Sequence, residues 1–599
     1  MKYLESNYQT VRRKTRTVMV GNVAVGGDHP VRIQSMTHSS TSDMEGTVDQ
    51  IIRLADAGCK IARVTVQGKR EAAACEGIKN ALIQKGYSIP LVADIHFYPP
   101  AAMLAAEFVD KVRINPGNFA DKRATFKTIK YSDATYAAEL DKIRETFAPL
   151  VEKCKKFKRA MRIGTNHGSL SDRVMSRYGD TSFGMLKSAL EFAQICREMD
   201  YHDFIFSMKA SNPLVMVQAY RLLVAEMNVL GWDYPIHLGV TEAGDGEDGR
   251  VKSAIGIGSL LLDGIGDTIR VSLTEDPWFE IDPCQRLINF ASSYEEKKAP
   301  PYVKLNRNIH EIKPRRFVRE APPLHRDGSV ILWGEKEEGL EVDGFCDGSI
   351  ILFKDETLPV VSVDELSGER AAAWIKDGDP NLWSKLLEAP AEFILLELTE
   401  LALHMGRQFF EWIRNAKLDI PVILVGSYLL SEEETVIRAS MEMGALLADG
   451  MGEGLLLKTN LPPQKAASLS FNILQGCRMR ASKTEFIACP SCGRTLFDLQ
   501  EVTQKIRAKT GHLPGVKIAI MGCIVNGPGE MADADFGYVG SGRDAIDLYV
   551  GKECVERGIH YSEAVDRLIK LIKDHNRWVE PQKLGVDHEK NRSCSPLSV

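Results

Sequence analysis

Two cysteines three positions apart are the first residues whose types and spacing could do chemistry. Cys489 and Cys492 lie in the stretch TEFIACPSCGR, late in a chain of 599 residues. Such pairs occur in redox-active dithiols, in zinc knuckles and in iron–sulfur sites. A zinc ribbon would need a second Cys-x-x-Cys pair, and none follows. A thioredoxin-like dithiol would follow the first strand of its own fold, and this pair does not.

A third thiol, Cys523, follows in MGCIVNGPGE. The glycines and the proline of this stretch predict a tight turn, in which backbone amides approach sulfur atoms and tune the potential of a cluster. Three thiolates would leave one corner of an iron–sulfur cube to be filled. Cys477 is a candidate fourth ligand by proximity, and Glu530 is the other, a hard carboxylate that would form the weakest of the four bonds. Spacing alone does not decide between them.

The chain before residue 290 alternates short β-branched runs with amphipathic helical stretches. After a predicted hairpin at VMVGNVAVGG, the runs are VRIQSM, IARVTV, LVADIHF, KVRINPG, AMRIGTN, FIFSMKAS, PIHLGVTE and TIRVSL. Eight strand–helix units are what a closed (β/α)8 barrel of the TIM type requires. A doubly wound open sheet is the alternative, but such sheets usually have fewer strands. The sequence therefore predicts an α/β barrel.

Polar side chains recur at the carboxyl ends of these runs, where a TIM barrel builds its active site. Five of them are cations from five strands: Arg63, Arg113, Arg162, Lys209 and Arg270. The same ends carry Asp94, His96, Asn115, Asn166, Ser211, His237, Glu242 and Ser272, with Gln34 and Thr37 on the first run. A lone strand arginine is more often a solvated surface residue, but inward cations on most strands need an anionic guest to offset their desolvation. Since Arg and Lys together suit phosphoryl oxygens, we expect a phosphate or diphosphate ester, with Asp94 and Glu242 as candidate acids or bases.

Length and changes of composition predict three domains. Residues 1–290 would form the barrel, and a charged, Pro-rich stretch from about 295 to 328 marks its end. Renewed alternation of strands and helices predicts a second α/β domain over residues 291–475. Residues 476–599 predict a small α+β domain that carries the cysteine site and ends in a polar tail.

Charge and composition narrow the classes of function. The net charge of −6 disfavours a dedicated nucleic-acid binder. The basic N-terminal stretch lacks the apolar core of a secretory signal, and no apolar run is long enough to span a bilayer. Twelve cysteines in 599 residues are too few for a disulfide scaffold. We therefore expect a cytoplasmic protein with reduced thiols that binds neither nucleic acid nor membrane.

The stretch GDGEDG at residues 244–249 formally matches the dinucleotide-binding pattern GxGxxG. Its variable positions hold Asp245, Glu247 and Asp248, whose charges would repel a pyrophosphate. A flexible acidic loop is the better interpretation.

Taken together, these motifs resemble one known family. VRIQSMTHSSTSD, LVADIHF, RINPGN, KAS, LGVTEAG, VKSAIGIGSLLLDGIGDTIRVSL, FIACPSCGR and GCIVNGPGE are similar to stretches of the 4-hydroxy-3-methylbut-2-enyl diphosphate synthases, iron–sulfur enzymes of the non-mevalonate isoprenoid pathway. The resemblance covers about residues 10–285 and 484–580. Residues 295–475 resemble the extra, barrel-like domain of the family's long, three-domain form.

The resemblance implies a cofactor, a reaction and roles for residues. The cofactor is a [4Fe–4S] cluster held by Cys489, Cys492, Cys523 and Glu530, and not by Cys477. The substrate is 2-C-methyl-D-erythritol 2,4-cyclodiphosphate, which is ring-opened and loses a hydroxyl group in two one-electron reductions, with ferredoxin or flavodoxin as electron donor. The cationic rim would hold the diphosphate while the cluster domain closes over it. Glu242 would donate a proton to the departing oxygen, and Asp94, His96, Asn115, Asn166 and His237 would shape the pocket.

Some features depart from the family's pattern, and other functions stay open. His38 and His167 stand where other small or polar residues are expected, and the loop after Glu242 is unusually acidic. The middle domain shows no comparable rim of cations, which predicts a structural or spacer role. One competing hypothesis is a zinc-dependent or metal-independent barrel enzyme for another phosphorylated metabolite. Another is a non-catalytic zinc-ribbon or RNA-binding scaffold, which the lack of interleaved aromatic residues in KIRAKTGHLPGVK disfavours.

Overall fold

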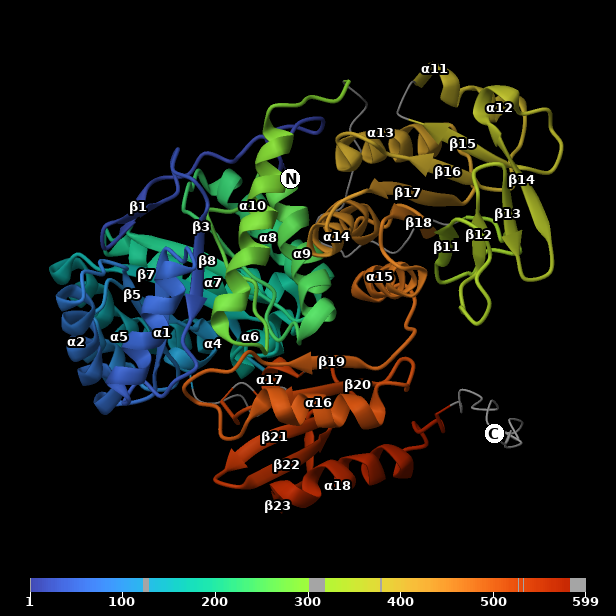
Figure 1. The fold of residues 1–599 in the computed structure, drawn as a ribbon. Helices are drawn as coiled ribbons and strands as arrows, with labels where there is room; N and C mark the ends of the chain where they lie inside the picture. Colours follow the sequence, from blue (N-terminus) through green and yellow to red (C-terminus); the bar gives the residue numbers. More distant parts are fainter. Residues whose placement is uncertain are drawn as a thin grey trace, which may run out of the picture.

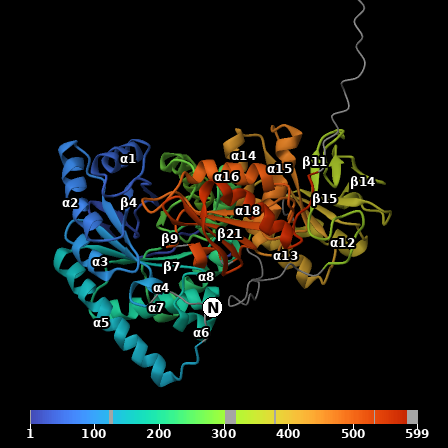
Figure 2. The ribbon, with the colours of Figure 1, turned by 90° about the horizontal axis from the view of Figure 1, so that it is seen from below.

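The computed structural model describes residues 2–121, 129–300, 318–376, 380–525, 527–531 and 533–581. They form two barrels side by side and a smaller sheet domain below them (Figure 1). In Figure 2, seen from below, the small domain covers the centre of the molecule, with one barrel on either side. None of the helices within the described ranges has the length and apolar character needed to cross a membrane.

The first barrel confirms the predicted (β/α)8 fold. Its strands are β3 (Arg32–Met36), β4 (Ile61–Val66), β5 (Leu91–Ile95), β6 (Lys111–Ile114), β7 (Ala160–Asn166), β8 (Phe204–Lys209), β9 (His237–Leu238) and β10 (Thr268–Ile269). Neighbouring strands are parallel, and a bridge between Phe206 and Ile236 joins β8 to β9 and closes the ring. The predicted hairpin is present as β1 (Val18–Val20) and β2 (Val23–Val25). Its valines pack on Ile61, Val92, Ala160 and Ile205, and so close the amino end of the barrel.

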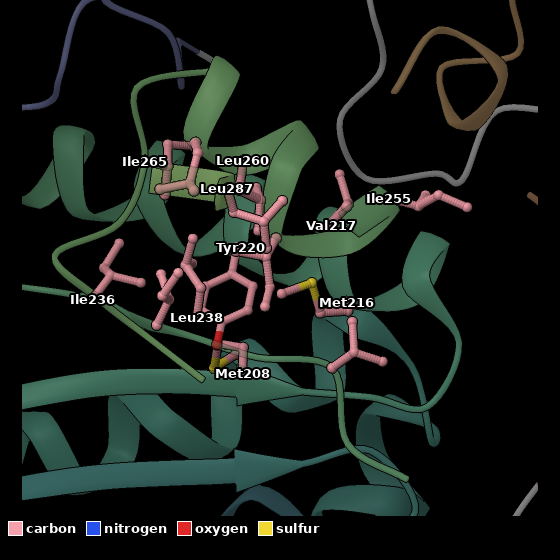
Figure 3. Packing of buried hydrophobic residues seen from close by; sticks show 14 of the residues in the cluster. Met208, Met216, Val217, Tyr220, Ile236, Leu238, Ile255, Leu260, Ile265 and Leu287 are labelled. Carbon is pink, nitrogen blue, oxygen red and sulfur yellow. The ribbon is translucent and has the colours of Figure 1, made fainter. Parts of the chain in front are cut away.

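Helices cover the outside of this barrel. They are α1 (Met44–Asp56), α2 (Lys69–Gln84), α3 (Pro99–Ala105), α4 (Pro116–Phe119), α5 (Asp133–Phe157), α6 (Asp172–Tyr178), α7 (Ser182–Glu198), α8 (Pro213–Leu230), α9 (Gly246–Leu262), the 3-10 helix η1 (Pro277–Glu280) and α10 (Ile281–Glu295). Polar N-cap side chains start several of them; Asp43 accepts a hydrogen bond from the Gly46 amide at the start of α1. Figure 3 shows how the layers meet: Tyr220 of α8 packs among Met208, Leu238 and Leu260, from β8, β9 and α9.

The second domain is also a closed barrel. Its strands are β11 (Ser329–Trp333), β12 (Gly344–Cys346), β13 (Ile350–Phe353), β14 (Thr357–Ser362), β15 (Ala372–Lys376), β16 (Ile394–Glu397), β17 (Val422–Tyr428) and β18 (Gly454–Thr459). Only β13 runs antiparallel to its neighbours; the other pairs are parallel. The helices are η2 (Val363–Glu365), α11 (Pro380–Trp383), α12 (Lys385–Glu388), α13 (Ala402–Asn415), α14 (Glu432–Ala448) and α15 (Pro463–Gly476).

The two barrels meet through α9 and α14, which glycines bring close together. A Cβ atom at Gly258 would come within 2.5 Å of Met441, and one at Gly444 within 2.6 Å of Ile255. Four buried ion pairs of 2.6–2.8 Å join α8, α13 and the ends of α9 and α14: Arg221–Asp263, Arg221–Asp449, Arg407–Asp263 and Arg407–Asp449. Because every charge in this ring has two partners of opposite sign, the interface buries it without an uncompensated ion.

The C-terminal domain is a five-stranded sheet with helices, as predicted. Its strands, in spatial order, are β19 (Glu485–Ala488), β20 (Lys517–Met521), β21 (Phe536–Gly542), β22 (Ala545–Val550) and β23 (Glu553–His560). Its helices are α16 (Leu499–Thr510), α17 (Gly527–Glu530) and α18 (Tyr561–Asp574). We propose the predicted limits of 1–290, 291–475 and 476–599 for the three domains, with the refinement that α10 continues past residue 290.

Candidate active site

The carboxyl ends of the first barrel's strands surround a cavity that the C-terminal domain also borders. Ten predicted residues of the barrel line it: Arg63, Asp94, His96, Arg113, Arg162, Asn166, Lys209, Glu242, Arg270 and Ser272. Cys489, Cys492, Arg494 and Cys523 line it from the other side. The five cations are at most 7% exposed. One enclosed space therefore joins the cationic rim and the cysteine site.

The cations of this rim are unequally neutralised. Arg270 makes a two-pronged ion pair with Glu280, through Nε at 2.9 Å and Nη2 at 2.8 Å. Arg113 donates to Asp94 at 2.9 Å. By contrast, Arg63, Arg162 and Lys209 have no carboxylate within 4.0 Å in the described part of the chain, and two guanidinium nitrogens of Arg162 lack any hydrogen-bond partner there. Burial, reinforced by the neighbouring cations, lowers the pKa of Arg162 and of Lys209 well below the ordinary values.

Asp94 sits at the centre of a polar network that crosses the domain boundary. Burial alone would raise the pKa of its carboxyl, but Arg113 and Arg63 outweigh burial and hold it well below the ordinary value. Arg494 of the C-terminal domain donates to the Asp94 backbone carbonyl at 3.0 Å and to its carboxylate at 3.3 Å. Burial lowers the pKa of His96 to about 3, so the neutral imidazole accepts a hydrogen bond of 2.6 Å from Arg113. Asp94 is therefore an ionised anchor, which does not suit a proton donor.

The thiols meet because β19 and β20 are parallel neighbours whose carboxyl ends lie at the same edge. Cys489 directly follows β19, and Cys523 lies two residues beyond β20. The Cys489 sulfur accepts a hydrogen bond of 3.2 Å from the Gly522 amide. Cys477, the other candidate ligand, lies at the end of α15 and donates to the Gly444 carbonyl of α14 at 3.4 Å, outside the cavity. Within the described ranges, no three His, Cys, Asp or Glu side chains converge on a single-ion site.

Glu530 and Glu242 face each other between the two domains. Glu530, on the short helix α17, is 3% exposed; its Oε1 accepts a hydrogen bond from Asn166 of β7. Glu242 is 1% exposed, and burial together with the Glu530 charge raises the pKa of its carboxyl well above the ordinary value. One oxygen of each carboxyl has no partner among the described residues other than the carboxyl that faces it. Glu242 also holds a left-handed backbone with φ of 49°, a strained conformation that is typical of functional positions.

Several predicted residues lie away from the cavity. Asn115 is buried and caps α4, where its side-chain oxygen accepts from the Gly117 amide at 3.1 Å. His237 lies inside the barrel with Nδ1 2.5 Å from the Thr268 hydroxyl, and Ser211 is buried just beyond β8. None of these three borders the cavity, so their contact with a substrate stays a prediction.

The residues whose types depart from the family's pattern also lie outside the cavity. His38 contacts Asp276 at 3.2 Å, and His167 lies 3.6 Å from Asp180.

Sequence reasoning missed three charged residues, one that lines the cavity and two that are buried in the barrel around it. Arg494 directly follows the CPSCG stretch, which is the only signal for it in the sequence. Lys111 lies two residues before Arg113 on β6, so the strand period places it on the same inward face; it donates to Gln34 at 3.1 Å. Glu280, the partner of Arg270, lies in η1 and has no local signal, because only the fold brings the two together.

The acidic stretch 244–249 is not the flexible loop that we expected. Its residues from Gly246 onward begin α9, and its carboxylates bind cations of the C-terminal domain. Asp248 lies 2.7 Å from Lys483 and 3.0 Å from Arg507, which also pairs with Asp245. A backbone bridge between Ala243 and Ala488 extends this contact. The extra acidic residues therefore help to hold the C-terminal domain over the mouth of the barrel.

Comparisons with known proteins add the family. Residues 15–285 match the GcpE TIM-barrel domain, and residues 485–574 match the GcpE protein C-terminal domain. The chain is 54% identical to the 4-hydroxy-3-methylbut-2-en-1-yl diphosphate synthase (flavodoxin) of Protochlamydia amoebophila, with 98% of this chain and 99% of that protein covered. It is 50% identical to the chloroplastic 4-hydroxy-3-methylbut-2-en-1-yl diphosphate synthase (ferredoxin) of Arabidopsis thaliana, with 97% of this chain and 90% of that protein covered.

A comparison with solved structures gives distant matches. An N-acetylneuraminic acid synthetase from Leptospira borgpetersenii is 13% identical, with a TM-score of 0.31 over 48% of this chain and 91% of that one, a likeness that carries no conclusion. The two domain matches and the near full-length identities do carry one. The chain belongs to the GcpE family, the family of the 4-hydroxy-3-methylbut-2-en-1-yl diphosphate synthases.

Proposed function

We propose that this chain is an oxidoreductase that converts 2-C-methyl-D-erythritol 2,4-cyclodiphosphate to 4-hydroxy-3-methylbut-2-enyl diphosphate. Two electrons break one carbon–oxygen bond of the ring, and the diphosphate stays attached through its other end. A neighbouring hydroxyl group leaves as water after taking a proton, and a carbon–carbon double bond forms. The observation that carries the proposal is the single cavity bordered by buried cations on one side and by Cys489, Cys492 and Cys523 on the other.

The cations are suited to hold the diphosphate. Arg162 and Lys209 are buried without a carboxylate partner in the described ranges, so an anionic guest would offset their desolvation. Arg113 and Arg270 are held in place by Asp94 and Glu280. Fixed guanidinium groups bind phosphoryl oxygens in a defined orientation, so the substrate would be held between these cations and the cysteines.

The thiols on the C-terminal side of the cavity support a [4Fe–4S] cluster as the cofactor. Cys489, Cys492 and Cys523 supply three soft thiolates, and the Gly522 amide already points at the Cys489 sulfur. We assign the fourth position to Glu530, whose buried Oε2 has no partner in the described part of the chain other than the facing Glu242 carboxyl. When bound there, the cluster would supply the two electrons one at a time from a reduced ferredoxin or flavodoxin.

Glu242 is our candidate proton donor. Its carboxyl is buried at the same cavity, and one of its oxygens has no partner among the described residues other than the facing Glu530 carboxyl. A carboxyl positioned in this way can protonate the departing oxygen within an enclosed site. The buried pairing of Arg494 with Asp94 joins the C-terminal domain to the rim of the same space.

The electron donor and the cellular compartment rest on the relatives' names and on the sequence. The Protochlamydia relative is named for flavodoxin, and the Arabidopsis relative for ferredoxin and the chloroplast. We propose that this chain takes electrons from one of these two donors. The expected cytoplasmic location stays a prediction.

The test is anaerobic reconstitution with iron and sulfide, followed by assay with the cyclic diphosphate and a chemical reductant. We expect an absorption band near about 400 nm that dithionite bleaches, and formation of the linear diphosphate with one water per turnover. Cys489→Ser should abolish both. The matched control is Cys554→Ser, because Cys554 lies on β23 of the same domain away from the cavity. Colourless protein that carries zinc, or activity that survives Cys489→Ser, would contradict the proposal.

A further inference from the structure

A second cavity lies at the mouth of the second barrel. Its volume is about 420 Å³, within the range of small-molecule sites. Trp333 ends β11, Lys376 ends β15, and Lys458 is the penultimate residue of β18; all three line the cavity. These strands are parallel members of one barrel, so the cavity opens at their carboxyl ends, the end at which TIM barrels bind ligands.

Lys458 and the side chains that it contacts form a polar group along one wall of this cavity. The Lys458 ammonium lies 4.6 Å from the centre of the Trp333 ring and 4.4 Å from that of Trp374. It also makes an ion pair of 2.6 Å with Glu397, whose other carboxylate oxygen accepts a hydrogen bond of 2.9 Å from the Trp374 indole. Because each member holds the next, the group is preorganised.

Stability does not explain this arrangement. The layers below it are filled by apolar side chains, including Ile331, Leu395, Val425 and Leu456, as is usual for a TIM barrel. A buried ion pair is on average no more stabilising than well-packed hydrophobic residues of the same volume. A barrel that only served as a spacer could continue the aliphatic packing to its mouth. The change from aliphatic to aromatic and charged residues at the ligand-binding end indicates a site.

The lining determines the chemistry of the ligand. Trp333 is 42% exposed, and its indole offers a platform for a flat ring beside Val360 and Val361. Gly348 fits against this ring, since a Cβ atom there would come within 3.0 Å of it. Lys458 and Lys376 can bind an anionic group.

Two glutamates limit the charge of that group. Glu397 is paired with Lys458, and Glu365 lies on the rim. The Glu397 carboxylate already neutralises Lys458, whereas Lys376 has no carboxylate within 4.0 Å in the described ranges, so the mouth suits a single anionic group and not the diphosphate that we propose for the first barrel.

We propose that the mouth of the second barrel binds a small molecule that combines a flat heteroaromatic ring with one carboxylate or phosphate group. This site is separate from the proposed active site, since the two cavities share no lining residue. The inference does not depend on the reaction proposed above.

The test is isothermal titration calorimetry of the full-length holoenzyme with four probes. Adenosine 5′-monophosphate and indole-3-carboxylate carry a ring and an anionic group; adenosine and indole are their neutral counterparts. We expect at least one anion to bind with Kd below about 1 mM and about tenfold more tightly than its neutral counterpart. Whether the phosphate or the carboxylate binds identifies the source of the anionic group.

Two variants with exposed side chains locate the binding. Trp333→Ala should weaken the anion at least about tenfold by removing the platform, and Lys376→Ala should weaken it about threefold while leaving the neutral probe unchanged. Turnover of the cyclic diphosphate should stay within about twofold for both, because neither residue borders the first cavity. Arg162→Met is the control for anion binding in the first barrel and should leave the new site intact. The proposal fails if neither anion binds, if Trp333→Ala binds as the wild type does, or if Arg162→Met abolishes the binding.

Discussion

The two barrels share a fold but differ in whether the charged side chains at the carboxyl ends of their strands have partners of opposite charge. The first buries five cations at its mouth, and Arg162 and Lys209 have no carboxylate partner within the described ranges. In the second, the partly buried Lys458 is paired with the buried Glu397 at 2.6 Å, above aliphatic layers. A buried charge without a partner lowers stability until an anion arrives, whereas a paired charge is satisfied in the empty barrel. Unsatisfied charge, and not the fold, therefore distinguishes the barrel suited to a polyanion.

Arg162→Met should give the largest effect of the substitutions considered. It should weaken substrate binding and raise the stability of the fold. Removing an uncompensated buried cation should raise the thermal midpoint, while the KM for the cyclic diphosphate should rise at least about 100-fold, equivalent to about 3 kcal/mol. Steady-state kinetics and differential scanning calorimetry measure the two. The matched variant is Arg270→Met, which leaves Glu280 buried without its partner and should lower the midpoint. An unchanged KM for Arg162→Met would remove this residue from the substrate site.

Lys458→Met makes the corresponding change in the second barrel and should have the opposite effect on stability. It leaves Glu397, whose side chain is 8% exposed, without its cation, and should lower the free energy of unfolding by about 2 kcal/mol. Adding Glu397→Gln should recover part of the loss, because no charge is then left unpaired. Thermal unfolding of the single and double variants gives the coupling. If Lys458→Met were neutral, the charges of the second mouth would not be matched as we describe.

Much of the contrast between the barrels could be predicted from the sequence, because a strand places alternate residues on one face. This period gave the eight runs of the first barrel and the inward cations at their ends. The strand period could not predict the true length of β9. The run continues past Leu238, but the strand ends there, because the chain leaves the sheet and places Glu242 against Glu530. Likewise, nothing local shows that β13 runs antiparallel within a closed barrel.

Ion-pair partners were the least predictable part of the site. The cations were found from their positions, but their neutralisation by Glu280 and Asp94 depends on residues that only the fold brings near. The acidic stretch after Glu242 was interpreted as a loop for the same reason: its partners Lys483 and Arg507 belong to another domain. Side-chain type and strand register can be read along the chain, whereas compensation of charge is a tertiary property.

The pH dependence of stability tests whether the His404 imidazole is held neutral between the two barrels. This side chain of α13 lies 3.0 Å from the Thr10 hydroxyl; burial, then Arg407, lowers the pKa of its imidazole to about 4. Since the unfolded imidazole has its ordinary pKa near about 6.5, the unfolded chain takes up a proton first as the pH falls. Stability is therefore lost between about pH 6.5 and pH 4, by about 2 kcal/mol at pH 5.

His404→Gln keeps a hydrogen-bonding group at this position and cannot titrate. Relative to the wild type, it should lose less stability between pH 7.5 and pH 5, by about 2 kcal/mol, equivalent to about 2 °C in the thermal midpoint. His575→Gln, at the end of α18 and away from the barrels, is the control. Identical pH dependence in the wild type and His404→Gln would show that this imidazole is not held neutral between the barrels.

Asp248→Asn tests how the C-terminal domain is held over the mouth of the first barrel. Among the described residues, none of this domain lines the mouth of the second barrel. Burial raises the pKa of Asp248, but Lys483 and Arg507 outweigh it and lower the pKa, so the carboxylate stays charged at neutral pH. Removing one partly exposed charge should weaken the contact of the C-terminal domain with the first barrel by about 1 kcal/mol and reduce kcat/KM about fivefold.

Added salt should reduce activity of the wild type more than that of the variant, because it screens the ion pairs that the variant lacks. Asp282→Asn, which breaks a surface ion pair with Arg286 inside the first barrel, should change neither quantity. Equal salt dependence of Asp248→Asn and the wild type would show that the acidic stretch does not hold the C-terminal domain against the first barrel.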